Sequence, residues 1–126
     1  MGSGSSLTIY GQSTGDGAGQ LNAQAYQVGD SAGIGGNTNE NAAHGDITIN
    51  GGVITAKSFG GGAGIGSGSG TGASDKPNGT ITINGGKVTA TAGGSNGAGI
   101  GGGYFNKITG GNIVINGGTV KAKGAK

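Results

Sequence analysis

The chain has 126 residues, of which 36 are Gly and one is Pro, and its charged residues make up 10% of the total. Seven Lys against five acidic residues give a formal net charge of +2. Collagen is excluded, because it needs Gly at every third position and abundant Pro. The lack of Cys excludes a disulfide scaffold and a thiolate zinc site. The scattered Lys residues are too sparse for a nucleic-acid-binding surface, and no apolar run reaches the roughly 18 residues of a membrane span.

The first six residues, Met1–Ser6, are typical of an artificial leader placed ahead of a domain. We therefore expect one repeat domain over residues 7–126. The sequence stops at Lys126, where another copy of a repeated block would be due, so we expect a fragment of a longer array.

Repeated blocks follow one another along the chain. A divergent first copy places Leu7-Thr-Ile-Tyr and Leu21-Asn-Ala-Gln around a polar loop at residues 11–20. Three closer copies align without gaps over residues 47–57, 81–91 and 113–123, each built around Asn-Gly-Gly. A second block, Ala-Gly-Ile-Gly, recurs at residues 32–35, 63–66 and 98–101. Within every block apolar residues alternate with small or polar ones, which predicts three short strands per repeat.

Two folds fit three strands per repeat. Asn-Gly pairs at positions 50, 84 and 116 are strong signals for the tight turns of β-hairpins. A parallel β-solenoid fits better, because like residues then meet one coil apart at strand spacing. Stacking predicts five inward columns, which are Leu7/Ile47/Ile81/Ile113, Ile9/Ile49/Ile83/Ile115, Leu21/Ile54/Val88/Val120, Ala23/Ala56/Ala90/Ala122 and Ile34/Ile65/Ile100. We therefore predict an all-β fold, a right-handed parallel β-helix of about three and a half coils, with an amide ladder of Asn50, Asn84 and Asn116 at one corner.

Three motifs follow one another along the chain, namely Leu-Thr-Ile-Tyr, Ala-Gly-Ile-Gly-Gly and Ile-Thr-Ile-Asn-Gly-Gly-x-Val-Thr-Ala-Thr. This combination resembles Gly-rich repeats of large secreted or cell-wall proteins of Gram-positive gut bacteria. Some of those proteins are labelled carbohydrate-binding β-helix proteins. The resemblance covers about residues 7–123 and implies an extracellular or cell-surface, adhesin-like protein. It carries no binding motif that assigns a role to individual residues of this chain.

Little in the sequence suggests catalysis. The single His, His44, lies in a polar loop and is expected to be solvated. Asp30 and Asp46 flank the second block, so they are the acids most able to form a catalytic pair. Since polysaccharide-acting β-helix enzymes often combine acids with basic residues, the lack of Arg disfavours that activity. No catalytic residue, metal site or cofactor is predicted.

Three surface features remain as candidates. Outward Thr residues form columns at Thr48 with Thr82 and at Thr55 with Thr89, which could bind ice or a glycan, although β-branched residues also simply suit strands. The Gly residues of the Ala-Gly-Ile-Gly block would expose bare backbone on an outward face for a partner surface, or merely relieve crowding. These interface candidates are Gly33, Gly35, Gly64, Gly66, Gly99 and Gly101.

The third feature is the group of loops at residues 36–46, 67–79 and 102–111, which should gather on one edge. The last loop holds Tyr104, Phe105, Asn106 and Lys107, a combination suited to sugar stacking. An alternative is that Tyr104 or Phe105 folds back as a lid over the glycine-rich strand. We expect a non-enzymatic spacer or adhesin that binds a glycan or another surface protein at this edge, with self-association through open coil ends or the glycine face. Ice binding and polysaccharide cleavage are the alternatives.

Overall fold

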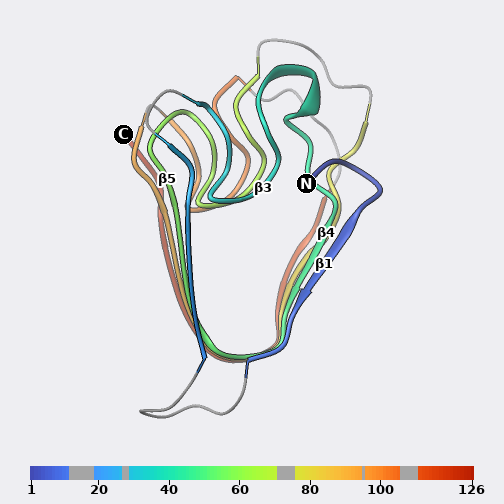
Figure 1. Ribbon diagram of the computed structural model, residues 1–126, viewed down its shortest axis with the longest axis vertical. Helices are drawn as coiled ribbons and strands as arrows, with labels where there is room; N and C mark the ends of the chain where they lie inside the picture. The colour runs from blue at the N-terminus through green and yellow to red at the C-terminus, as the bar shows by residue number, and fades with distance from the viewer. Residues whose placement is uncertain (12–18, 27–28, 71–75, 95, 106–110) are drawn as a thin grey trace.

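The computed structural model describes residues 1–11, 19–26, 29–70, 76–94, 96–105 and 111–126. In this part of the chain the backbone winds into a right-handed parallel β-helix of stacked coils (Figure 1). The elements in chain order are β1 (Ser6–Ile9), β2 (Gln20–Gln24), β3 (Ile34–Gly35), the 3-10 turn η1 (Asn39–Asn41), β4 (Asp46–Ile49), β5 (Val53–Ser58), β6 (Ile65–Gly66), β7 (Ile81–Ile83), β8 (Lys87–Ala92), β9 (Ile100–Gly101), β10 (Ile113–Ile115) and β11 (Thr119–Lys123). Among these residues no helix is long and apolar enough to cross a membrane.

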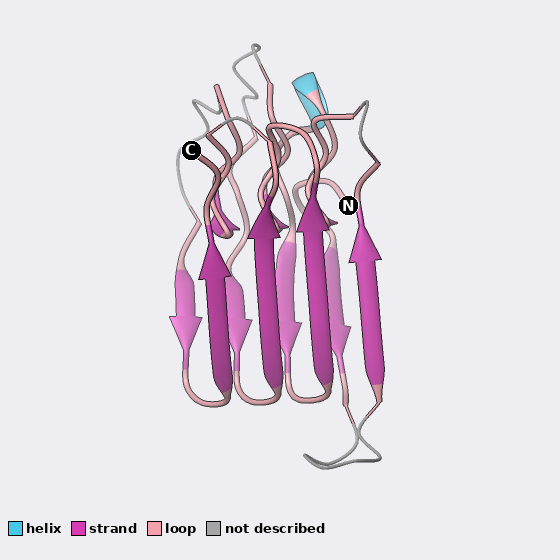
Figure 2. Ribbon diagram, turned by 90° about the vertical axis from the view of Figure 1, so that its left-hand side faces the viewer, coloured by secondary structure: helices cyan, strands magenta, loops and turns pink. Residues whose placement is uncertain are grey.

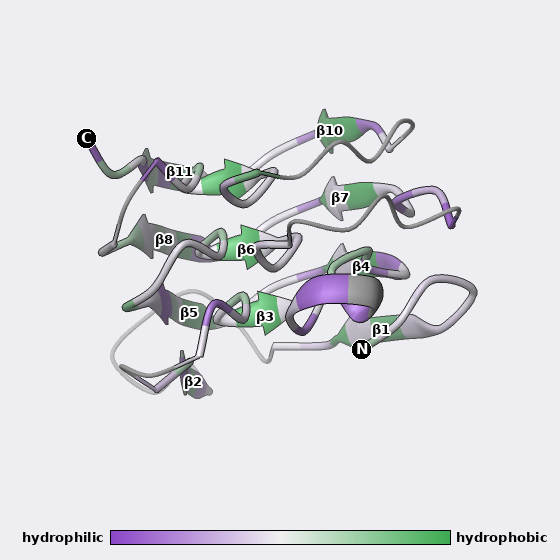
Figure 3. Ribbon diagram, turned by 90° about the horizontal axis from the view of Figure 1, so that it is seen from above, coloured by the Kyte–Doolittle hydropathy of each residue, from purple (hydrophilic) through white to green (hydrophobic). Residues whose placement is uncertain are grey.

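Equivalent strands of successive coils stack into three parallel sheets. The first sheet has the order β1-β4-β7-β10, the second β11-β8-β5-β2, and the third β3-β6-β9. The first and second sheets run side by side and meet at tight corners at one end of the molecule (Figure 2). Seen from above, the coils form successive layers, with β1 and β2 in the first and β10 and β11 in the last (Figure 3).

The predicted columns are confirmed residue by residue. Ile47 pairs with Leu7 on one side and Ile81 on the other, and Ile65 pairs with both Ile34 and Ile100. The inward aliphatic side chains of the middle coils are buried and form one continuous core. Since each apolar residue meets its own counterpart one coil away, a short motif can build a core by repetition.

The Asn-Gly-Gly corners connect two different sheets, so the hairpin alternative is wrong. A type I′ hairpin turn needs positive φ at both central residues, Asn and the first Gly. Here the positive φ falls on the second glycine of each corner, +89° at Gly52, +90° at Gly86 and +87° at Gly118. The predicted amide ladder is present, because the side-chain amide of Asn84 donates to Asn50 and that of Asn116 donates to Asn84, both at 2.8 Å.

The glycine strand, the third strand of each coil, departs from the prediction of a bare outward face. Gly64 and Gly66 are buried. A Cβ placed on Gly64 would lie 2.5 Å from the backbone nitrogen of Thr91, and one on Gly66 would lie 2.0 Å from the carbonyl oxygen of Gly101. Five of the six predicted interface glycines therefore pack against the chain's own backbone and are not available to a partner, namely Gly33, Gly35, Gly64, Gly66 and Gly99. A Cβ on the sixth, Gly101, would meet only side-chain atoms, at 3.6 Å or more.

The reason lies in how the glycine strand closes the coil. It dips between the first and second sheets, and the backbone N–H of Ala63 donates to the carbonyl of Ser67 at 2.9 Å, which ties off a five-residue loop. Equivalent bonds join Ala32 to Gly36 and Ala98 to Gly102. Ile65 at the tip of this loop fills the core from the open side. Only residues without a side chain leave space for this close approach of three backbone segments.

Candidate functional site

The predicted gathering of loops on one edge produces a pocket of about 400 Å³. Its walls come from three coils, with Asp30 and Asn39 from the first, Phe59 and Ser69 from the second, and the Tyr104–Phe105 segment from the third. Gly60, Gly61, Gly70 and Gly94 complete the lining. We refer to this hollow as the loop pocket.

Backbone hydrogen bonds between coils hold the walls of the loop pocket. The N–H of Tyr104 donates to the carbonyl of Gly61 at 2.7 Å, and the N–H of Asn39 donates to the carbonyl of Ser69 at 3.0 Å. The Asp30 carboxylate accepts the N–H of Gly61 at 2.8 Å. These bonds tie loops that are far apart in sequence, so the pocket is formed before any ligand arrives.

Aromatic rings supply the apolar part of the loop pocket. The ring centroids of Tyr104 and Phe105 are 3.9 Å apart at an interplanar angle of 44°. Phe105 is 58% exposed, so a ligand has access to its ring. Phe59 also lines the pocket, and the ammonium of Lys57 sits 4.2 Å from its ring centroid, a cation–π contact that orients the ring.

A second pocket, basic in character, begins where the loop pocket ends. Gly94 lines both, and the second pocket of about 680 Å³ is also lined by Lys57, Lys123 and Lys126. Lys57 and Phe59 therefore connect a basic area to an aromatic one.

The other sequence candidates are placed elsewhere. The Thr columns are in the predicted register, Thr48 with Thr82 and Thr55 with Thr89. The first pair lies on the outer face of the first sheet and the second pair on that of the second sheet, so they form no common plane and do not line the loop pocket. Asn106 and Lys107 lie outside the described residues.

His44 contradicts the prediction of a solvated loop residue. Its side chain is only 3% exposed, and its Nδ1 lies 2.7 Å from the carbonyl oxygen of Gly45. Desolvation lowers the pKa of His44 below its ordinary value of 6.5, although the Gly45 carbonyl and the charge of Asp46 act in the opposite direction. The loop is polar in sequence, but it folds against the next coil, where Asn78 accepts the backbone N–H of His44 at 3.2 Å.

The two acids considered as a catalytic pair serve separate structural roles. Asp30 binds the N–H of Gly61, and Asp46 accepts the N–H of Thr80 at 2.7 Å. Each carboxylate thus fastens its own coil to the next. Within the described ranges no cluster of three or more His, Asp and Glu side chains could hold a metal ion.

Sequence reasoning missed Phe59, Asn39 and Ser69 as pocket residues. The available signal was departure from the repeat, since Phe59 directly follows the second strand, at a position where the next coil has Gly93. A residue that stacking does not require is a better candidate for binding than one repeated in every coil.

A comparison with protein-family models gives a match described as a β-helix repeat over residues 47–69, 81–104 and 113–125. The matched stretches are copies of a β-helix repeat, in agreement with the parallel β-helix of the described residues. No curated protein and no solved structure matches the chain.

Proposed function

We propose that this protein is a non-enzymatic, extracellular adhesin or spacer domain that binds a glycan in the loop pocket. The observation that supports this most is the composition of a preformed hollow of about 400 Å³. It combines the rings of Phe59, Tyr104 and Phe105 with the polar side chains of Asn39 and Ser69. Sugar rings have apolar faces that stack on aromatic side chains and hydroxyl groups that bond to amides and hydroxyls.

The neighbouring basic pocket favours an acidic polysaccharide. A chain whose neutral face rests on Phe59 would extend past Gly94 toward the ammonium groups of Lys57 and Lys123. Carboxylate or sulfate groups on such a chain would pair with these lysines, and the attraction would weaken as salt is added.

The Thr columns do not favour the ice-binding alternative. Their pairs lie on two different faces, and the register places Val114 next to Thr82 and Lys121 next to Thr89 in the last coil. An extended plane of like residues is therefore not formed. The engagement of Asp30 and Asp46 with backbone N–H groups likewise gives no support to polysaccharide cleavage.

A glycan array followed by titration of the strongest ligand tests the proposal. Phe59→Ala and Phe105→Ala should each weaken binding about five- to tenfold, because stacking of a sugar on one ring contributes on the order of 1–1.5 kcal/mol. Tyr26→Ala is the matched control, since Tyr26 is a strongly exposed aromatic residue that does not line the pocket. Equal affinity of all three variants and the wild type, or an array without ligands, would overturn the proposal.

The proposal that the glycan is an acidic polysaccharide is tested separately. Lys57→Gln and Lys123→Gln should lower the affinity for an acidic ligand and reduce its salt dependence, whereas Lys87→Gln, an exposed Lys outside both pockets, should not. The protein could instead bind neutral glycans with an affinity that Phe59→Ala lowers and the lysine variants leave unchanged. That result would support glycan binding in the loop pocket and would contradict an acidic polysaccharide as the ligand.

A further inference from the structure

The loop pocket contains a negative charge and, among its described lining residues, no positive one. The charge is that of Asp30, whose side chain is exposed and therefore accessible to a ligand. One carboxylate oxygen, Oδ1, accepts the N–H of Gly61 at 2.8 Å, and the other, Oδ2, accepts no hydrogen bond from the described residues. Asp30 thus keeps one acceptor oxygen for a ligand.

Gly61 holds this carboxylate next to the aromatic rings of the loop pocket. Its N–H donates to Asp30, and its carbonyl accepts the N–H of Tyr104 at 2.7 Å. The ring of Tyr104 in turn lies 3.9 Å from that of Phe105, centroid to centroid. A carboxylate attracts an ammonium group by its charge, and an aromatic face attracts it by the quadrupole of the ring. The two together are the chemistry of a site for a protonated amine.

The molecule already places an ammonium group on an aromatic ring at the border of the loop pocket. The Nζ of Lys57 lies 4.2 Å from the ring centroid of Phe59. Lys57 lines the second, basic pocket and not the loop pocket, so the charge of the loop pocket itself is that of Asp30. A negative pocket is therefore followed along the surface by a positive one, to which Lys57 and Lys123 contribute.

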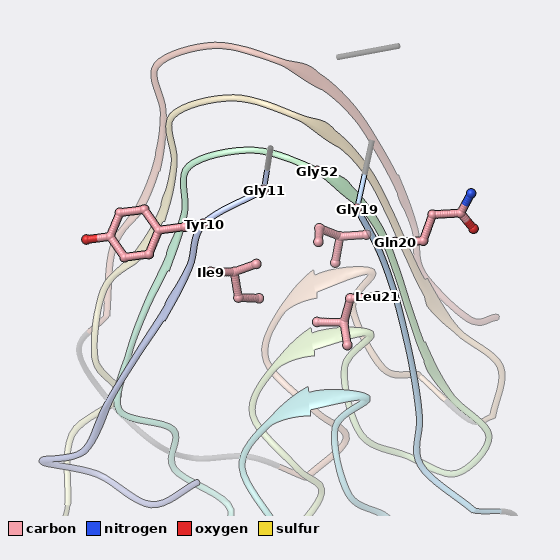
Figure 4. A pocket seen from close by; sticks show the side chains of 8 residues that line it. Ile9, Tyr10, Gly11, Gly19, Gln20, Leu21 and Gly52 are labelled. Atoms are coloured by element: carbon pink, nitrogen blue, oxygen red, sulfur yellow. The ribbon is translucent and has the colours of Figure 1, made fainter. Parts of the chain in front are cut away.

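The hollow at the corner between β1 and β2 has no comparable chemistry. This space of about 470 Å³ is lined by Ile9, Leu21 and Ile54 together with corner residues. Ile9 and Leu21 point toward each other into it, while Tyr10 and Gln20 point away (Figure 4). Because none of its lining residues is charged, the argument for a charged ligand applies to the loop pocket and not to every hollow of the surface.

We propose that the loop pocket binds the protonated amino group of an amino sugar, within a polysaccharide that also carries acidic groups. This inference rests on the glycan binding proposed above and names the sugar. The ammonium group would pair with Oδ2 of Asp30 and lie against the rings of Tyr104 and Phe105, while an acidic group farther along the chain would reach Lys57. N-acetylation removes the positive charge, so an acetylated sugar would leave the carboxylate unpaired.

A lysine side chain of another protein is the other source of an ammonium group. Asn39 and Ser69 favour the sugar, because both line the same pocket and offer an amide and a hydroxyl. The hydroxyl groups of a sugar ring need such partners, whereas the aliphatic stem of a lysine does not.

Titration with two disaccharides tests the proposal on the wild type. One is β-1,4-linked glucosamine with free amino groups, and the other is its N-acetylated form, which has the same backbone and no charge. The wild type should bind the free amine about fivefold more tightly or better, since it gains both an ion pair and cation–π contacts. Added salt should weaken the binding of the free amine and leave that of the acetylated form unchanged.

Two variants separate the charge of Asp30 from its role in the fold. Asp30→Asn removes the charge but keeps an oxygen that can accept the N–H of Gly61, so it should bind the free amine about threefold more weakly and the acetylated form as the wild type does. Asp46→Asn is the matched control, because Asp46 likewise accepts a backbone N–H of the next coil, from Thr80, but does not line the pocket. It should bind both disaccharides as the wild type does.

Equal affinity of the wild type for the two disaccharides, or tighter binding of the acetylated one, would overturn the amino sugar while leaving glycan binding intact. A loss with Asp46→Asn as large as that with Asp30→Asn would overturn it too, and so would a trilysine peptide that binds more tightly than the free amine. Binding of neither disaccharide would also overturn it, and a glycan array without ligands would overturn the proposed function as well. Circular dichroism establishes that the variants are folded, and the comparison on the wild type decides even if Asp30→Asn is not.

Discussion

At the scale of single residues, glycines in the third strand are required for two separable reasons. Gly66 has a φ of +135° and lies against the carbonyl oxygen of Gly101, so a side chain there meets both backbone strain and a steric clash. Gly101 has a φ of +127°, but a Cβ on it would make only ordinary contacts. Gly102 has neither constraint.

Substituting alanine at these three positions should separate the free-energy cost of a positive φ from that of a steric clash. Gly66→Ala should lower the free energy of unfolding by more than about 3 kcal/mol and Gly101→Ala by about 1–3 kcal/mol, while Gly102→Ala should stay within about 0.5 kcal/mol. Urea unfolding measures all three. Equal losses at Gly66 and Gly101 would mean that backbone conformation, and not close packing, makes glycine necessary.

His44 is the residue for which pH should matter. Because burial lowers its pKa in the folded state below 6.5, the unfolded chain binds the proton more readily. The stabilising contribution of neutral His44 is therefore present above pH 6.5 and is lost as the pH falls from there toward the lower folded-state pKa.

The melting temperature of the wild type should therefore drop between neutral pH and about pH 5. His44→Gln should be less stable at neutral pH but should lose less on acidification. A wild type whose melting temperature is the same at both pH values, or a variant with an undiminished drop, would contradict a buried neutral imidazole.

At the scale of elements, the Asn-Gly-Gly corners join the first and second sheets and are linked to one another by side chains. The side chain of Asn84 bonds to those of Asn50 and Asn116, whereas among the described residues the side chain of Asn116 bonds only to that of Asn84. The ladder satisfies the amides of one corner with those of the next.

Asn84→Ala should destabilise by about 1 kcal/mol, because it removes two exposed hydrogen bonds, and Asn116→Ala should cost about half as much. Thermal unfolding of both variants provides the comparison. If the two substitutions cost the same, the ladder contributes nothing beyond the corner's own conformation.

At the scale of the whole molecule, each coil is stabilised by its neighbours, so equivalent residues contribute unequally. Ile83 and Ile115 occupy one column, but Ile83 has a coil on either side and Ile115 has one. Ile83 is fully buried, while half of Ile115 is exposed to water.

Ile83→Ala should lower the free energy of unfolding by about 3–5 kcal/mol and Ile115→Ala by less than about 1 kcal/mol. Chemical denaturation of the two variants and the wild type measures both losses. A loss at Ile115 as large as that at Ile83 would show that a second neighbouring coil adds nothing to the contribution of an inward Ile.

Period-two alternation and the recurrence of like residues were sufficient to predict the parallel β-helix, its columns and the ladder at Asn84. Stacking requires a counterpart for every inward residue, and that requirement is visible in a single sequence. The gathering of loops on one edge followed from the same repeat, which is why Tyr104 and Phe105 could be singled out.

The direction of the glycine strand, the burial of His44 and the part played by Phe59 were decided only by tertiary structure. The alternation of residues in the glycine strand predicts that its two faces differ. A face made of glycines can lie against water or against another backbone segment. Only the path of the chain between the first and second sheets shows that the glycines lie against backbone. Loop residues carry no periodic pattern, so their burial depends on contacts with other coils. The sequence by itself therefore determined what repeats, and the three-dimensional structure decided where the parts that do not repeat come to lie.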